Sequence, residues 1–167
     1  MEPKVAPLHA IFELNTDLLL NCLEGLSDED ALQRLEGGGN TIAFLAGHLT
    51  DTRHFLAGRL GHPLANPLSR YLAQASSIDD IIEWPTLAEQ REWWRTVSRH
   101  LSDVLAARTP EELSRPDAHR FPMADSTELG LIAFLAQHDS YHIGQMGFLR
   151  RQLGKQAMTY ARGALAG

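Results

Sequence analysis

Residues 131–152 read LIAFLAQHDSYHIGQMGFLRRQ, and this stretch decides the fold. Apolar side chains recur in it at spacings of three and four, which predicts one long amphipathic helix. Asp125-Ser-Thr-Glu128 is a suitable start for this helix, and Gly154 a suitable stop. The basic pair Arg150-Arg151 suits the negative end of the helix dipole. The stripe expected to face inward comprises Leu131, Leu135, His138, His142, Gln145, Leu149 and Gln152.

Further helices are expected upstream of this stretch, because helical periodicity and capping sequences recur while no strand pattern competes. Short segments are expected at 27–35 and after the capping sequence 109–112. The glycine run 37–39 is a break, and 62–85 is a long connection punctuated by prolines. The sequence therefore predicts an all-α protein, a four-helix bundle with a long crossover between its second and third long helices. The other long helices are expected at about 7–24, at 41–60 after a cap at Asn40 or Thr41, and at 86–105.

Length and composition narrow the class of protein. The 167 residues are most simply one domain, 1–167, with a core of its own. The chain has 21 acidic and 15 basic residues, and this acidic balance argues against binding to nucleic acid, which requires clustered basic side chains. It has neither an apolar run that could span a membrane nor an export signal, so a cytoplasmic location is expected. Its single cysteine, Cys22, excludes a cysteine-based zinc cluster and lies on an apolar stripe, as a buried thiol would.

His138 and His142 are the first candidates for a functional site. Side chains four residues apart lie on one face of a helix, so two histidines at this spacing can bind the same metal ion. Among eight histidines roughly 0.3 such pairs arise by chance, so the spacing alone is a weak motif. Its context is stronger, because an imidazole on an apolar face needs a partner. His48 lies on the apolar face of the helix at 41–60, which can face the helix at 131–152 in a bundle.

We therefore expect His48, His138 and His142 to bind one divalent transition-metal ion. An all-imidazole site suits zinc, nickel, copper or iron rather than magnesium or calcium. Three protein ligands leave at least one coordination position open, which is typical of a catalytic rather than a structural site. Water, a substrate thiolate or a substrate carbonyl can fill that position.

Helical spacing also identifies three residues that could orient these histidines or a bound water. Asp51 follows His48 by three residues, Tyr141 follows His138 by three, and Gln145 follows His142 by three. An ordinary surface role explains each of them equally well. Asp139 points about 100° away from His138 and is not expected at the site. The remaining histidines are set aside, with one reserve ligand among them, His100; the others are His9, His54, His62 and His119.

The run His138-x-x-x-His142-x-Gly144-Gln145-x-x-x-Leu149-Arg150-Arg151, taken together with His48, resembles the DinB-like family of metal-binding four-helix bundles. The resemblance extends over most of the chain in order, but it includes no motif in 62–85 or after Lys155. It implies an up-down-down-up bundle that binds one divalent ion through the three histidines. Zinc and nickel are the ions that we expect first at such a site. Relatives include thiol-dependent isomerases and transferases, and they are often homodimers.

Two classes of function with a bound metal remain open from the sequence, and a third reading requires that no metal binds. One is a metal-dependent enzyme acting on a small-molecule substrate, either a thiol transferase that uses a low-molecular-weight thiol or a hydrolase. The chain lacks the glutamate that follows the first histidine of His-Glu-x-x-His proteases, and this favours thiol chemistry. The other is a non-catalytic, stress-related bundle in which the ion joins two helices. A plain helical interaction protein with buried histidines is the third reading, and it requires that no metal binds.

Overall fold

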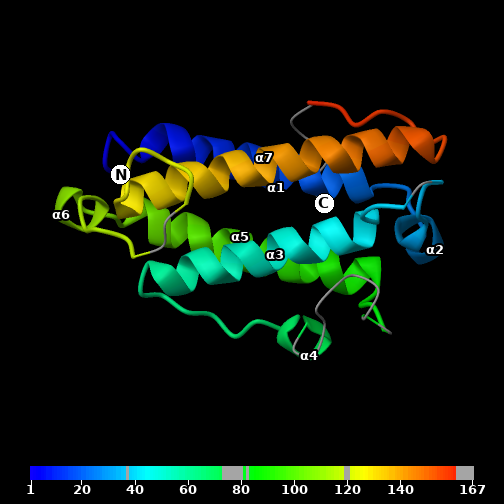
Figure 1. The fold of residues 1–167 in the computed structure, drawn as a ribbon, viewed down its shortest axis with the longest axis horizontal. Helices are drawn as coiled ribbons and strands as arrows, with labels where there is room; N and C mark the ends of the chain where they lie inside the picture. Colours follow the sequence, from blue (N-terminus) through cyan, green and yellow to red (C-terminus); the bar gives the residue numbers. More distant parts are fainter. Residues whose placement is uncertain (37, 73–80, 82, 119–120, 161–167) are drawn as a thin grey trace.

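The computed structural model describes residues 1–36, 38–72, 81, 83–118 and 121–160. Over these residues the chain is helical and contains no strand (Figure 1), which confirms the all-α class. The helices are α1 (Ala6–Leu23), α2 (Asp28–Leu32), α3 (Ile42–Arg59), α4 (Ser69–Leu72), α5 (Leu87–Ala106), α6 (Pro110–Leu113) and α7 (Glu128–Gln152).

The helix starts follow from capping residues that the sequence makes visible. Ser27, Thr86 and Thr109 each form a reciprocal capping box at the start of α2, α5 and α6. Of the two candidates for the start of α3, Thr41 is the cap, since its hydroxyl accepts from the backbone N–H of Phe44. The short helix expected at 27–35 ends earlier than predicted, since the last residue of α2 is Leu32.

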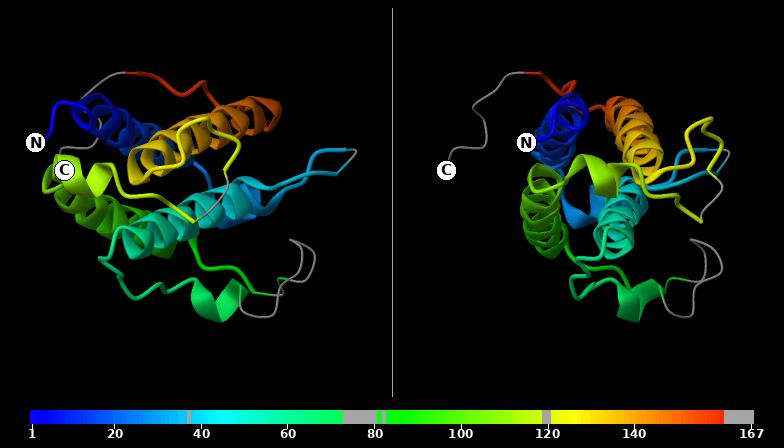
Figure 2. Two further views of the ribbon diagram at one scale, coloured as in Figure 1. Left: turned by 60° about the vertical axis from the view of Figure 1, so that its left-hand side comes forward. Right: turned by 90° about the vertical axis from the view of Figure 1, so that its left-hand side faces the viewer.

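The four long helices lie side by side, and the end-on view in Figure 2 places them at the corners of a square. Neighbouring pairs are α1 with α5 and α7, and α3 with α5 and α7. In Figure 1, α1 and α7 run in one direction while α3 and α5 run in the other. The helix that carries His48 is thus the direct neighbour of the helix that carries His138 and His142. The 62–85 connection is described only in part, and residues 73–80 and 82 lie outside the described residues.

Two apolar clusters fill the space between these helices. All four long helices contribute to each of them, and burying their side chains is the main favourable contribution to folding. Representative members of the cluster nearer α2 are Leu19, Leu49, Trp94 and Met146, and of the cluster nearer α6 they are Phe12, Leu56, Leu101 and Ile132.

A buried ion pair crosses the core between α3 and α7. The guanidinium of Arg53 donates from Nε to Oδ2 of Asp139 at 2.9 Å, and both side chains are about 1 % exposed. Arg53 also donates to α1 and α5, and its charge lies over the Trp94 ring at 3.8 Å from the ring centroid. Its acceptors there are Thr16 Oγ1 at 2.7 Å, Ser98 Oγ at 2.6 Å and the Phe12 carbonyl at 3.0 Å.

The buried stripe of α7 differs from the predicted one. The helix is turned so that Asp139 faces the core, while His138 and His142 are half-buried at the edge of the contact with α3. Gln152 is exposed. The prediction failed because it assigned a charged residue to the outside, whereas Arg53 on another helix compensates the charge of Asp139. From residue 131 onward, the buried residues of α7 are Leu131, Ile132, Leu135, Ala136, Asp139, Ile143, Met146 and Arg150.

Arg150 also has a larger role than helix-end electrostatics. Its guanidinium is buried and donates to the carbonyls of Cys22 and Glu24, which follow one another closely at the end of α1, and to that of Gln156. It therefore joins the end of α7 to the end of α1 and to the following segment. None of the helices that the structure describes combines the length and the apolarity needed to cross a membrane.

Removing one partner of the core ion pair will be strongly destabilising. Asp139→Leu leaves the Arg53 charge buried without its counter-ion, and we expect a loss of about 3–5 kcal/mol in the free energy of unfolding. The double variant Arg53→Met/Asp139→Leu removes both charges and should recover most of this loss. Urea unfolding at pH 7 measures all three proteins. A loss below about 1 kcal/mol in the single variant would contradict this role of the pair.

Candidate metal centre

His48 from α3 and His138 and His142 from α7 converge at one point between the two helices. The Nε2 atoms of His48 and His138 lie 3.2 Å apart, and those of His138 and His142 lie 3.1 Å apart. One ring nitrogen from each of the three residues lies within 4.8 Å of the others. Among the described residues this is the one group of three or more metal-ligating side chains with such spacing.

This spacing fits a shared metal ion. A cation about 2.0–2.1 Å from each nitrogen holds neighbouring nitrogens about 3.3 Å apart in tetrahedral geometry, and about 3.0 Å apart at right angles. The observed separations lie between these values. The Nδ1 atom of His138 is buried and has no hydrogen-bond partner among the described residues. The His138 ring therefore has its polar contacts on the Nε2 side alone, where the other two imidazoles meet it.

Gln145 fixes the orientation of one of the three rings. Nδ1 of His142 lies 2.7 Å from Oε1 of Gln145. An amide oxygen only accepts, so Nδ1 carries the proton and the lone pair of His142 lies on Nε2, which faces the other histidines. A partner of this kind on the far ring nitrogen is typical of metal-binding histidines.

The other two residues proposed to orient ligands make different contacts in the structure. Asp51 accepts a hydrogen bond from Nδ2 of Asn66 at 2.6 Å, although its charge still acts on His48 through space. The ring of Tyr141 packs edge-on against His142 with 5.1 Å between centroids, rather than against His138. Gln145 alone of the three nominated residues makes a hydrogen bond to one of the three histidines within the described structure.

Aromatic rings frame the histidines, and the sequence reasoning missed two of them. Phe44 stacks on His48 with an interplanar angle of 3°, and Phe134 lies against His138 with 6.3 Å between centroids. Each phenylalanine precedes its histidine by four residues, so the i, i+4 rule that found the histidine pair would also have found these contacts.

The electrostatic environment keeps two of the imidazoles neutral. Burial lowers the pKa of His48, as does the nearby His142. Burial, with His142 and His48 beside it, lowers the pKa of His138 to about 4. Neutral imidazole is the form that binds metal, so near pH 7 these rings present the lone pairs that a cation requires.

The remaining histidines have partners away from this centre. His100, the reserve ligand, bonds the His62 carbonyl through Nε2 at 2.8 Å, so it does not join the three. His54 bonds the Leu64 carbonyl, and His9 bonds Ser102. His119 lies outside the described residues.

Cys22 is buried elsewhere in the core, as its place on the apolar stripe predicted, and burial raises the pKa of its thiol to about 11. A thiol that stays protonated at neutral pH is a poor nucleophile.

The fold and the three converging imidazoles define a helical protein with a candidate metal centre between two of its long helices. A sequence model of the DinB superfamily matches residues 11–146, a span that includes all three histidines, and the chain belongs to this superfamily. A comparison with curated proteins found no significant match.

The metal-free protein should lose stability on acidification, in part because of His138. Its pKa in the folded state is about 4, against about 6.5 in an unstructured chain. Between these pH values the unfolded chain binds a proton that the folded protein does not, so stability falls as pH decreases from 6.5 toward 4. Urea unfolding of chelator-treated protein should show a steeper loss over this range than the His138→Asn variant. NMR titration of His138 with a midpoint near 6.5 would contradict the assignment.

Proposed function

We propose that the protein binds one divalent transition-metal ion, zinc or nickel, through His48, His138 and His142, and that it is a metal-dependent enzyme acting on a small molecule. The observation that carries this proposal is the convergence of three Nε2 atoms at separations of 3.1 and 3.2 Å. Membership of the DinB superfamily supports it, because the resemblance implies a metal site at these three positions.

Within this proposal, thiol transfer is the favoured reaction and hydrolysis the runner-up. A bound divalent cation acts as a Lewis acid and stabilises a substrate thiolate at neutral pH. Hydrolysis additionally needs a residue that accepts a proton from water. Asp139, the carboxylate next to His138 in sequence, is committed to Arg53 in the core, and Asp51 is hydrogen-bonded to Asn66. Asp139 and Asp51, the carboxylates nearest in sequence to the histidines, are therefore poorly placed to serve as that base.

The protein's own residues would act mainly by positioning. Gln145 holds the proton of His142 at Nδ1, which keeps its Nε2 lone pair directed at the ion. The Phe44 and Phe134 rings lie next to the rings of His48 and His138 and form the apolar surroundings of the site. An ion held by these three imidazoles would supply a Lewis-acid site for the substrate.

We propose further that α1, α3, α5 and α7 form the up-down-down-up bundle implied by the family resemblance, in one domain over 1–167. The neighbour relations of the four helices and their contribution to both apolar clusters support this. A homodimer acting in the cytoplasm is part of the same proposal and rests on the resemblance and the sequence alone.

Metal stoichiometry tests the site. Protein purified without chelator or histidine tag should hold about one ion per chain, and His142→Ala should lose it together with a decrease in melting temperature. His100→Ala, which removes an imidazole outside the three, is the matched control and should keep the ion. Inductively coupled plasma mass spectrometry and thermal unfolding provide the measurements.

Several results would overturn parts of the proposal. A metal-free protein that takes up neither zinc nor nickel, and that melts at the same temperature as His142→Ala, would exclude the metal site. An ion with no exchangeable ligand, with no thiol binding and no hydrolysis across an ester and amide panel, would favour the non-catalytic alternative, in which the ion joins α3 to α7.

Gln145→Leu tests the orienting hydrogen bond. Leucine has a similar volume but its side chain accepts no hydrogen bond, so the His142 ring loses the contact that fixes its tautomer. We expect metal affinity to fall by about 10–100-fold with the stoichiometry unchanged. Competition with a chromogenic chelator measures the affinity, and an affinity equal to that of the wild type would contradict the role assigned to Gln145.

A further inference from the structure

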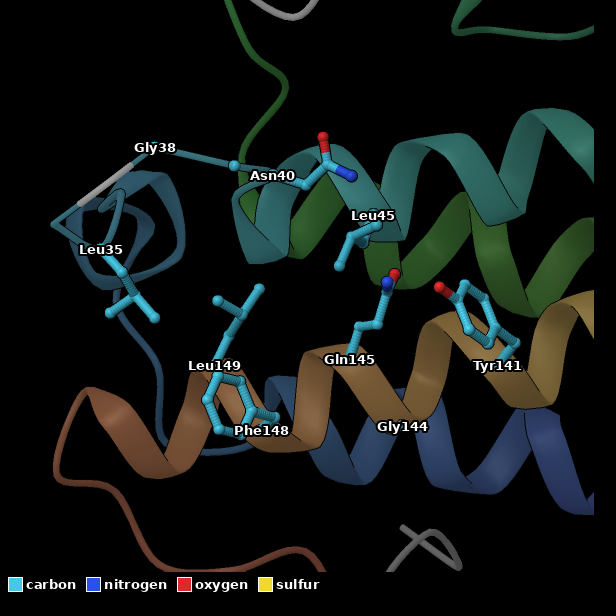
Figure 3. A pocket seen from close by; sticks show the side chains of 10 residues that line it. Leu35, Gly38, Asn40, Leu45, Tyr141, Gly144, Gln145, Phe148 and Leu149 are labelled. Carbon is cyan, nitrogen blue, oxygen red and sulfur yellow. The ribbon is translucent and has the colours of Figure 1, made fainter.

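A pocket opens between the connection from α2 to α3, the start of α3 and the later half of α7 (Figure 3). Its volume is about 580 Å³, within the range of about 300–1,000 Å³ typical of small-molecule sites. It is lined by Leu35, Gly38, Gly39, Asn40, Leu45, Tyr141, Gly144, Gln145, Phe148 and Leu149.

The described residues that line this pocket carry no charge. Its walls are leucine side chains and two aromatic rings, Tyr141 and Phe148, which are 57 % and 59 % exposed. Exposed aromatic rings beside a pocket can contact a ligand without first breaking other packing. Its side-chain amides, on Asn40 and Gln145, are neutral groups that offer both a donor and an acceptor.

This lining selects against an ionic ligand. A carboxylate or ammonium that leaves water needs a counter-charge or a set of hydrogen bonds, and none of the described lining side chains supplies the charge. An uncharged molecule loses little on entering and gains contact with the apolar walls. The chemistry of the walls therefore favours a neutral, largely apolar ligand with at most a single polar group for an amide.

The pocket adjoins the metal centre through two shared residues. Gln145 lines the pocket and also accepts the hydrogen bond from His142, and Tyr141 lines the pocket and packs against the ring of His142. Figure 3 shows the Gln145 side chain extending from α7 toward Leu45 on α3. A ligand that fills the pocket thus lies against the residue that orients one of the three histidines.

We propose that this pocket binds the apolar end of an uncharged small-molecule substrate whose reacting group reaches the three histidines. The assignment of the occupant as a substrate rests on the proposed function. The preference for a neutral apolar ligand does not, because it follows from the pocket lining alone.

Gly144 provides a variant that adds a side chain at the wall of the pocket. A Cβ atom built at Gly144 meets nothing within 4 Å, and its backbone is helical, so Gly144→Leu places a side chain in open space at the pocket wall. Gly58 on α3 is also helical with nothing within 4 Å of an added Cβ, and it does not line the pocket. Gly58→Leu is therefore the matched control, and leucine favours a helix more than glycine does in both variants.

The first experiment uses two fluorescent probes that differ by one charge. N-phenyl-1-naphthylamine is neutral, and 8-anilino-1-naphthalenesulfonate is the same aromatic frame with a sulfonate. In titrations of metal-free and metal-loaded protein, we expect the neutral probe to bind at about one per chain and at least tenfold more tightly than the anionic one. Gly144→Leu should weaken it at least tenfold, and Gly58→Leu should not change it.

Failure of the pocket and failure of the metal site give different results. Neutral-probe binding that is absent, or equal in the two glycine variants, overturns the pocket assignment. Equal affinity for both probes overturns the preference for an uncharged ligand. Absence of bound metal, measured separately, overturns the proposed function while the probe titration still decides the pocket.

The second experiment tests whether the pocket serves the metal centre. In cobalt-loaded protein, a thiol bound to the ion gives a sulfur-to-cobalt charge-transfer band. We expect 2-phenylethanethiol, whose ring can enter the pocket, to produce this band at a concentration at least tenfold lower than 2-mercaptoethanol does, and Gly144→Leu to abolish the difference. Equal concentrations in the wild-type protein, or no band with either thiol, would overturn the substrate assignment.

Discussion

The arrangement of the helices depends on the hydrogen bonds and the ion pair that the buried guanidinium of Arg53 forms. From α3 it reaches Asp139 on α7, Thr16 and the Phe12 carbonyl on α1, and Ser98 on α5. A charge in a core is tolerated only when it is paired and its donors are used, and here the partners come from every other long helix. The network therefore couples the register of all four helices. Because Asp139 follows His138 directly, the same contact fixes where the histidines of α7 stand relative to α3.

The candidate metal centre follows from that register. His138 and His142 lie on one edge of α7 because they are four residues apart, and His48 precedes Arg53 on α3 by little more than one turn. When Arg53 meets Asp139, the two helices are set so that the three Nε2 atoms face each other. The centre needs no loop to position it, and side chains carried on helices are held more firmly than those on loops. Gln145 then completes the orientation of His142 and at the same time forms part of the neighbouring pocket.

Local sequence signals predicted much of this structure, and long-range ones did not. Ser27, Thr86 and Thr109 identified three helix starts because a capping box lies within four residues and needs no tertiary information. The meeting of His48 with His138 and His142 followed from apolar helix faces and the assumption of a bundle. The predicted rotation of α7 about its own axis was wrong. A charged residue in a helix is expected to face solvent unless its partner is known, and the partner of Asp139, Arg53, lies 86 residues away in the sequence. The pocket could not be predicted from the sequence either, since residues from the α2–α3 connection and from α7 meet only in the folded chain.

X-ray absorption spectroscopy of the metal-loaded protein is the most direct test of the central claim, that three imidazoles share one ion. For the zinc form, the account predicts three imidazole nitrogens at about 2.0–2.1 Å, with the remaining coordination filled by a light atom from solvent or by sulfur when a thiol is added. The His48→Ala protein should show one imidazole fewer. A first shell dominated by carboxylate oxygens, or a wild-type spectrum with fewer than three imidazoles, would contradict it.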